Sequence, residues 1–315
     1  MAVDAMFAKS QKDAEGEFLR NHNAMVRTST GAVHVITAEG KTIGRGLGLA
    51  RAQKALEAWE ALPENERQPG AVKIGERGER DPRLLEMSPP EGCLILRATN
   101  RHMGQTVEGD IRYLLVDDFS SERAQRSAPR YREPSNDFMW IMKDEWQELL
   151  PESPKVGDRA PVPAPILARL LRYHLNPLLS VRGAMCFTGS SPGDGKLEVV
   201  VEEVSPERVR LRLEGSARLS HPIVDADDLV YEPAFLGYVE YDPSKRTISR
   251  FDMIALGDLD GALPNLSGRP MAGIPDGTRP FGIAFGLIAD PSPAETIRPH
   301  GCSKRRSDYL NPSAE

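Results

Sequence analysis

The stretch Leu197-Glu-Val-Val-Val-Glu-Glu-Val204, followed after a short turn by Val209-Arg-Leu-Arg-Leu-Glu214, decides the fold of this chain. Apolar and charged side chains alternate here with a period of two. Because successive side chains of a strand lie on opposite faces, the pattern predicts a sheet with one buried face and one solvated face. The alternation continues to residue 257, and it indicates the architecture of the second half of the chain without indicating any chemistry.

Short turns predict that consecutive strands are neighbours in this sheet. The tetrapeptides at 205–208 (SPER) and 242–245 (DPSK) have the composition of tight turns. Two helices, one capped by Asp144 and one opened by Pro163, should pack on the sheet. The uncharged run 281–289 predicts a central strand buried on both faces. The predicted fold class is α+β, a mainly antiparallel meander or half-barrel with strands at about 182–188, 196–204, 208–219, 235–242, 246–257 and 281–289.

The composition is that of a soluble globular protein. The 315 residues suffice for two domains, with 40% hydrophobic and 27% charged side chains. The formal charge of −6 argues against a general nucleic-acid binder, which presents a basic surface. The N-terminus contains no apolar run long enough for a signal peptide, and no stretch reaches the roughly 20 apolar residues of a membrane span. We therefore expect a soluble, cytoplasmic protein.

Changes in composition divide the chain into four parts. Residues 1–65 predict a small α/β unit, and residues 66–90, rich in proline, glycine and charges of both signs, predict a linker. The antiparallel α+β domain should occupy residues 91–300. Residues 301–315 predict a flexible tail.

The first part carries a recognisable order of elements, a helix followed by a hairpin and a second helix. These features are Asp13-Ala-Glu-Gly-Glu-Phe18, the hairpin Gly31–Lys41, and the helix through Ala55, Leu56 and Trp59. Residues 11–62 therefore resemble the C-terminal half of a thioredoxin-like domain. That family begins its sheet with a strand and a Cys-x-x-Cys helix, and the resemblance would imply redox chemistry. Here there is no Cys-x-x-Cys and no proline before Gly31, so no catalytic residue carries over. The remainder resembles only proteins of no assigned function.

The loop between residues 257 and 280 is the first candidate site. Loops of more than about 12–15 residues are uncommon in compact domains and are often functional. This loop could cover one end of the sheet as a lid, with Arg269, Asp276 and Arg279 as polar contacts to a ligand. A second ligand surface is the aromatic hairpin that carries Tyr238 and Tyr241.

A cluster of one imidazole and three carboxylates is a candidate metal site. The residues are His221, Asp225, Asp227 and Asp228, and oxygen-rich loops of this kind bind calcium or manganese. The spacing lacks the glycine and the distal glutamate of an EF-hand loop. No cofactor is indicated by any other motif.

Two classes of function remain open. The preferred class is a non-catalytic module that binds a ligand or another protein, because the sheet is one-sided and no catalytic signature is present. The alternative is an enzyme, either a degenerate thioredoxin-like redox protein or a metal-dependent hydrolase that uses the cluster at His221–Asp228. The sequence identifies neither a small-molecule ligand nor a protein partner.

Overall fold

A computed structural model of the chain divides into two compact units, Met1–Ser88 and Pro89–Glu315. No helix of the described residues is both long and apolar enough to cross a bilayer. The structure describes residues 34–36, 42–45, 49–67, 88–119, 121–177, 187, 195–264, 268–270, 277–292, 295–303 and 306–312.

The first unit contains a hairpin followed by a helix. Strands β1 (His34–Ile36) and β2 (Thr42–Arg45) pair antiparallel, and helix α4 (Leu49–Glu60) follows, with the short α5 (Glu64–Arg67) after it. This is the order of elements on which the thioredoxin-like resemblance is based. The leading helix of that resemblance lies outside the described residues, so the resemblance stays a prediction.

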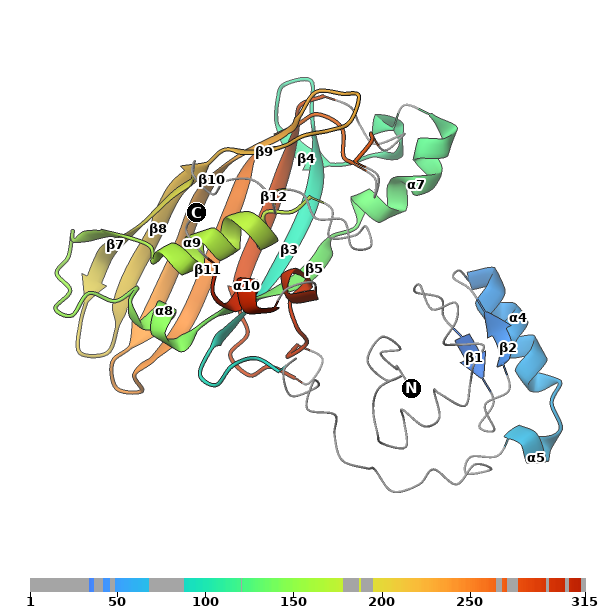
Figure 1. Cartoon of the computed structure of the whole chain (residues 1–315), viewed down its shortest axis with the longest axis horizontal. Helices are drawn as coiled ribbons and strands as arrows, with labels where there is room; N and C mark the ends of the chain where they lie inside the picture. Colours follow the sequence, from blue (N-terminus) through green and yellow to red (C-terminus); the bar gives the residue numbers. More distant parts are fainter. Residues whose placement is uncertain are drawn as a thin grey trace. The chain divides into compact units, whose positions relative to one another are not determined.

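The second unit is built on one antiparallel sheet of ten strands (Figure 1). The main path of the sheet runs β4-β3-β12-β11-β10-β8-β7-β6, while β5 lies beside β4 on the edge of β3 and β9 lies beside β8 on the edge of β10. The strands are β3 (Leu94–Gln105), β4 (Ile111–Tyr113), β5 (Ser135–Ile141), β6 (Arg159–Pro161), β7 (Gly195–Val204), β8 (Val209–Ala217), β9 (Leu219–His221), β10 (Leu229–Asp242), β11 (Thr247–Asp260) and β12 (Arg279–Leu287).

The order of the strands confirms the predicted antiparallel architecture. Strands β7 and β8 are neighbours across the turn at 205–208, and β10 and β11 across the turn at 242–245. In the second turn, the Asp242 carboxylate accepts hydrogen bonds from the Ser244 hydroxyl and from the backbone N–H groups of Ser244 and Lys245. The Ser244 hydroxyl, followed by the Lys245 backbone N–H, lowers the pKa of Asp242 to about 2. Strand β3, from an earlier part of the chain, pairs with β12 and extends the meander on that side.

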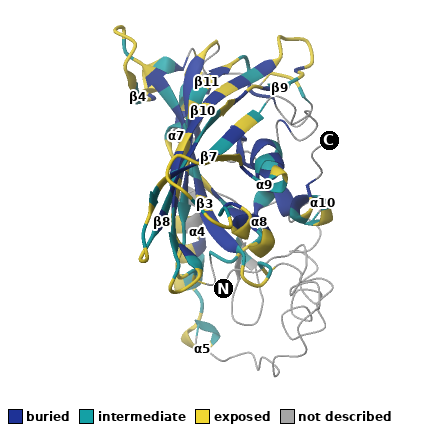
Figure 2. Ribbon diagram, turned by 90° about the vertical axis from the view of Figure 1, so that its left-hand side faces the viewer, coloured by how far each residue is buried: buried dark blue, intermediate teal, exposed yellow. Residues whose placement is uncertain are grey.

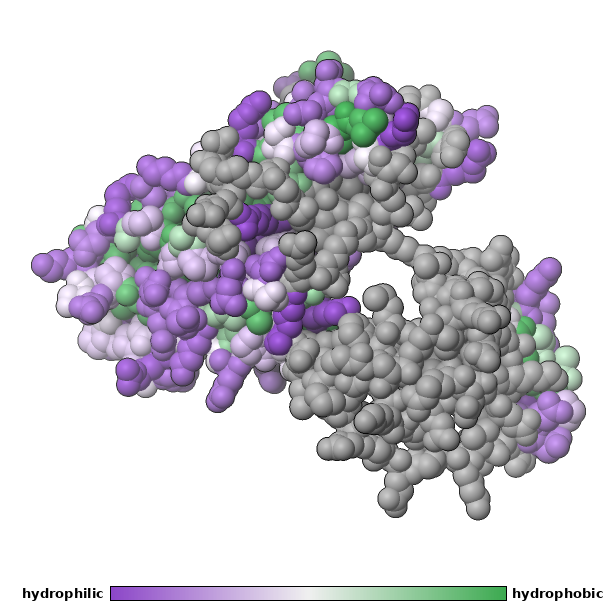
Figure 3. All heavy atoms as spheres, viewed as in Figure 1, coloured by the Kyte–Doolittle hydropathy of each residue, from purple (hydrophilic) through white to green (hydrophobic). Residues whose placement is uncertain are grey.

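The helices of the second unit are short. Helices α8, α9 and α10 lie on one side of the sheet, which we call the inner face (Figures 1 and 2). Where its residues are described, the surface seen from that side is mainly hydrophilic, with apolar patches between (Figure 3). The helical segments are the 3-10 turn Val116–Asp118, α7 (Glu122–Arg132), α8 (Lys143–Gln147), α9 (Ala164–Arg169) with its π-helical continuation Leu170–His174, the 3-10 turn His300–Ser303 and α10 (Arg306–Leu310).

Side chains of the strands and helices fill the inner face. Val209, Leu211 and Leu213 are buried there, as the alternation predicts. The hydrophobic core runs from β3 across the sheet to β7, and a void of about 10 Å³ lies between the sheet and α9. Apolar residues line this void without exception, among them Leu96, Ile166 and Phe251. The void is smaller than any organic ligand, because even one water molecule needs about this volume.

Three local expectations differ from the structure. Helix α8 begins after Met142, whose backbone N–H donates to the Glu145 side chain, so Glu145 rather than Asp144 caps it. The segment 208–219 is divided into β8 and β9. Strand β12 is central but not buried on both faces, because its alternate residue Ala284 is exposed.

Helix α10 is packed into the domain, although the sequence predicts a flexible tail at 301–315. Tyr309 is fully buried, and its backbone carbonyl accepts a hydrogen bond from the Arg169 guanidinium at 2.8 Å. Arg169 is itself fully buried, donates to both carboxylate oxygens of Glu145 at 2.6 and 2.7 Å, and donates to the Leu310 carbonyl. A buried guanidinium with this many acceptors joins α8, α9 and α10.

A second buried contact involves the Tyr309 hydroxyl. This group lies 2.7 Å from His174 Nε2 and accepts a hydrogen bond from the Trp140 backbone N–H. Burial, assisted by the positive charge of Arg169, lowers the pKa of His174 to about 3, so the ring is neutral. Burial also raises the pKa of the neighbouring Asp137 to about 6. All of these residues are buried, and we regard them as part of the interior packing.

Candidate functional site

Exposed aliphatic side chains gather on the outer face of the sheet, the side opposite the inner face. Leu236 of β10 and Ile254 of β11 are directly opposite each other, and each is about half exposed, at 52% and 53%. Leu256 follows Ile254 on the same face and is 37% exposed. These residues occupy positions at which the alternation predicts polar side chains.

The aliphatic surface continues across β12 onto β3 and β4. A side chain at Gly282 would place its Cβ 3.1 Å from Met103 Cε and 3.4 Å from Leu256 Cδ1, so Met103 and Leu256 approach each other over this glycine. Met103 pairs with Tyr113, which is 66% exposed and lies under the Arg101 guanidinium at 4.0 Å. We name as the apolar band Leu236, Ile254, Leu256, Met103, Tyr113 and the adjacent Ile111, which together cross β10, β11, β12, β3 and β4.

An open groove borders the apolar band. Its volume is about 700 Å³, and it follows β12, where the outer positions Ala284 and Gly286 are small. Thr99 of β3 forms one wall and Ile254 of β11 forms the other. The groove ends at the ion pair between Arg97 and Glu295.

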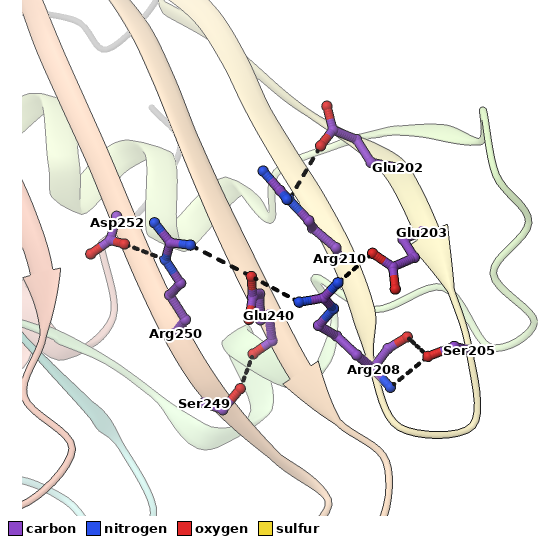
Figure 4. A network of polar contacts seen from close by, with 9 residues as sticks. All are labelled: Glu202, Glu203, Ser205, Arg208, Arg210, Glu240, Ser249, Arg250 and Asp252. Carbon is purple, nitrogen blue, oxygen red and sulfur yellow. Dashed lines mark hydrogen bonds and ion pairs between the residues drawn. The ribbon is translucent and has the colours of Figure 1, made fainter.

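The rest of the outer face carries ion pairs (Figure 4). Arg208 pairs with Glu203 at 2.6 Å and with Glu240 at 3.7 Å, and Glu240 also pairs with Arg250 at 3.6 Å. Hydrogen bonds from Arg208 to Glu203 and from Arg250 to Asp252 raise the pKa of both guanidinium groups. We name as the charged half the six basic and six acidic side chains Arg159, Lys196, Arg208, Arg210, Arg212, Arg250, Glu198, Glu202, Glu203, Glu214, Glu240 and Asp252.

Two carboxylates of the charged half lie opposite each other in the strand register, and a basic side chain compensates their repulsion. Glu198 of β7 is directly opposite Glu214 of β8, which is an unfavourable cross-strand pair. Arg159 of β6 lies 3.3 Å from the first carboxylate and 2.8 Å from the second, and so bridges them. Hydrogen bonding and charge from Lys196, with help from Arg159, lower the pKa of Glu198.

Three carboxylates with fewer basic partners lie beyond the apolar band, at the end of the sheet where β10 begins and β11 ends. Glu232 is directly opposite Asp258, and Asp260 follows on the same face. Arg218 pairs with Glu232, and the Thr278 hydroxyl donates to Asp260. In the described part of the chain, Asp258 has no ion-pair partner. We name Glu232, Asp258 and Asp260 the acidic border.

The residues of the predicted lid do not form one site. Arg269 is exposed and pairs with Asp225 at 2.8 Å, while Asp276 lies outside the described residues. Arg279 is buried on the inner face and donates to the carbonyls of Gly261 and Gly277. Arg279 therefore holds the two ends of the loop together.

Tyr238 and Tyr241 do not share a surface. Tyr241 packs against the core on the inner side, whereas Tyr238 lies on the outer face under the Arg210 guanidinium at 4.6 Å. Three residues of separation place two side chains of a strand on opposite faces. Phe235 and Phe251 of the same hairpin are also buried.

The predicted metal ligands are engaged separately. Asp225 pairs with Arg269, Asp228 accepts a hydrogen bond from Ser220, and burial lowers the pKa of His221. Among the described residues, no group of three or more His, Cys, Asp or Glu side chains is arranged to hold a metal ion. Asp227 is exposed in the same loop.

Sequence reasoning did not find the apolar band. Its signal was present, because Leu236, Ile254 and Leu256 are apolar at positions where a one-sided strand needs polar residues. Its continuity across β12 to Met103 could not be found from the sequence, since it depends on register between distant segments. Comparisons with protein-family models, with curated proteins and with solved structures found no significant match to this chain.

Proposed function

We propose that the chain is a non-catalytic binding module that holds a partner on the apolar band. The observation that carries this proposal is the contrast between the two faces of the sheet. On the inner face a void beside α9 has a volume of about 10 Å³, whereas the outer face presents apolar side chains of β10, β11, β3 and β4 beside a groove of about 700 Å³.

The fold itself gives no reason for the apolar band. The hydrophobic core is complete on the inner face, and polar residues at the outer positions would keep the same strand pairing. Contiguous exposed apolar patches on soluble proteins mark interaction sites. Burial of such side chains contributes about 25 cal/mol per Å² of apolar area removed from water, which favours association.

The support beneath the apolar band is rigid. Leu236, Ile254 and Leu256 belong to central strands whose backbone groups pair on both sides. Surfaces carried by paired strands keep their geometry better than surfaces carried by loops. A partner therefore meets a preformed surface and loses little free energy in ordering it.

Site-specific photo-crosslinking tests the proposal in cells of the source organism. A benzophenone amino acid placed at Ala234, which is exposed beside Leu236, should give a discrete adduct with a partner. The same group at Val156 is the control, because this residue is 67% exposed and lies in the turn before β6, the last strand in the order of the sheet. The Ala234 adduct should disappear when Leu236 and Ile254 are both changed to Ser. Equal labelling at the two positions, or an adduct that survives those changes, would contradict the proposal.

A further inference from the structure

We infer that the segment of the partner that contacts the apolar band is an amphipathic helix with basic residues along one edge. The inference rests on the proposed function and adds the chemistry of the partner. It is argued from the backbone pairing of the strands, from the charges beside the band and from its dimensions.

The backbone pairing of the sheet selects a helix. Strands β10, β11, β12 and β3 each pair with a neighbour on both sides, so their N–H and C=O groups are used within the sheet. A segment that docks on the face of the sheet finds no backbone partner there. It must satisfy its own N–H and C=O groups, and an α-helix does so within one segment.

The acidic border selects basic residues. Glu232 and Asp258 are directly opposite each other one position beyond Ala234 and Leu256 of the same face. In the charged half, Arg159 bridges the equivalent pair of Glu198 and Glu214. At the acidic border Arg218 pairs with Glu232 alone, and Asp258 keeps an uncompensated charge among the described residues.

The turn of the β3–β4 hairpin adds to this negative charge. Glu108 and Asp110 are exposed in this turn. The turn lies at the same end of the sheet as the acidic border, because the start of β12 pairs both with the end of β3 and with the end of β11. The repulsion within a like-charged pair opposes folding slightly. A cation supplied by a partner would attract both carboxylates and turn this repulsion into a favourable contribution to binding.

The dimensions of the apolar band suit one helix. It crosses five neighbouring strands, which is about 19 Å at roughly 4.8 Å per spacing. A helix of about 13 residues has this length. Aliphatic residues at helical spacing would contact Leu236, Ile254 and Leu256, while lysine or arginine on the flank would reach the acidic border.

Two synthetic helical peptides of about 18 residues test the inference on the full-length chain. One has leucine on one face and lysine on the other, and the second has the same leucine pattern with glutamate in place of lysine. Each is labelled with fluorescein, and binding is followed by fluorescence anisotropy at low and physiological salt. The Leu/Lys peptide should bind, and the Leu/Glu peptide should not.

Matched variants assign the binding to the surface. Changing Leu236 and Ile254 together to Ser should weaken binding of the Leu/Lys peptide about 30-fold. Asp258→Asn should weaken it about threefold, with a larger effect at low salt. Val156→Ser and Glu207→Gln remove an exposed aliphatic group and an exposed carboxylate elsewhere, and both should leave binding unchanged.

Each other outcome has a defined meaning. If Asp258→Asn and Glu207→Gln weaken binding equally, only net charge matters and the inference fails. If the Leu/Glu peptide binds as tightly as the Leu/Lys peptide, and the double Ser variant abolishes the binding of both, the inference fails while the proposed function stands. If neither peptide responds to the double Ser variant, the proposed function fails as well. A dimer in sedimentation that Ile254→Ser dissociates would assign the apolar band to a second copy and overturn the inference.

Discussion

The two faces of β11 differ in the role of their apolar residues. Phe251, Met253 and Ala255 lie on the inner face and are at most 4% exposed, whereas Ile254, between them in sequence, is 53% exposed. The inner residues belong to the hydrophobic core, whereas Ile254 lies on the open face and lines the groove. One strand therefore carries two separable sets of side chains, one needed for folding and the other free to serve binding.

Breaking the buried ion pair on the inner side should have the largest effect. Arg169→Met leaves the Glu145 carboxylate buried without its partner and removes the links to the Tyr309 and Leu310 carbonyls. We expect a loss of about 3–5 kcal/mol in the free energy of unfolding. Urea denaturation followed by circular dichroism measures it. Adding Glu145→Gln to Arg169→Met should recover part of the loss, and a double variant as unstable as the sum of the single changes would contradict this account.

Acidification should weaken the inner side before it affects the outer face. The pKa values of the buried His102 and His174 are lowered to about 3, so the unfolded chain binds more protons than the folded chain as the pH falls below 6.5. Asp137, whose pKa is raised to about 6, binds a proton in the folded state first and offsets one histidine. Stability should therefore fall by about 2 kcal/mol between pH 7 and pH 5, at about 1.4 kcal/mol per pH unit for each net proton.

Denaturation midpoints measured across this pH range check the sign. Asp137→Asn removes the offset, so its stability should fall more steeply than that of the wild type below pH 6. The exposed carboxylates with a lowered pKa change the stability only at lower pH, where they bind protons. Stability that is constant from pH 7 to pH 5 would show that the two histidines are not held neutral.

The charged half should contribute little to stability. Arg159→Gln removes the bridge between Glu198 and Glu214, but the Arg159 side chain is 54% exposed and solvent screens its charge. We expect a small decrease in the thermal midpoint at low salt that disappears in molar salt. The double change Glu198→Gln with Arg159→Gln should be as stable as the wild type. A large decrease that persists in molar salt would instead indicate a packing role for the arginine stem.

The smallest effect on folding should come from the apolar band. Ile254→Ser should change the free energy of unfolding by no more than about 0.5 kcal/mol, because the side chain is already half exposed. Met253→Ser on the adjacent inner position is the matched comparison and should cost about 2–5 kcal/mol. Guanidinium denaturation of both variants measures the difference. Equal destabilisation would remove the distinction between a folding face and a binding face.

The sequence predicted the sheet better than it predicted the site. Alternation from Leu197 to Glu214 depends only on residues close in the chain, and the structure confirms which face they bury. The run 281–289 predicts burial on both faces because it lacks charge. Its outer residues are in fact small rather than buried, and they border the groove. The absence of charged residues therefore does not distinguish a buried face of a strand from an exposed face that carries small residues.

The antiparallel class, the turns at 205–208 and 242–245, and the buried faces of β7 and β8 could be predicted from the sequence alone, because they follow from local steric and hydrophobic rules. Three further contacts depend on the tertiary packing: Met103 meets Leu256 over Gly282, Arg169 donates to the Tyr309 carbonyl in the interior, and Glu232 lies opposite Asp258. These contacts join segments far apart in the chain. Their register depends on the packing of the whole sheet, which no local pattern records.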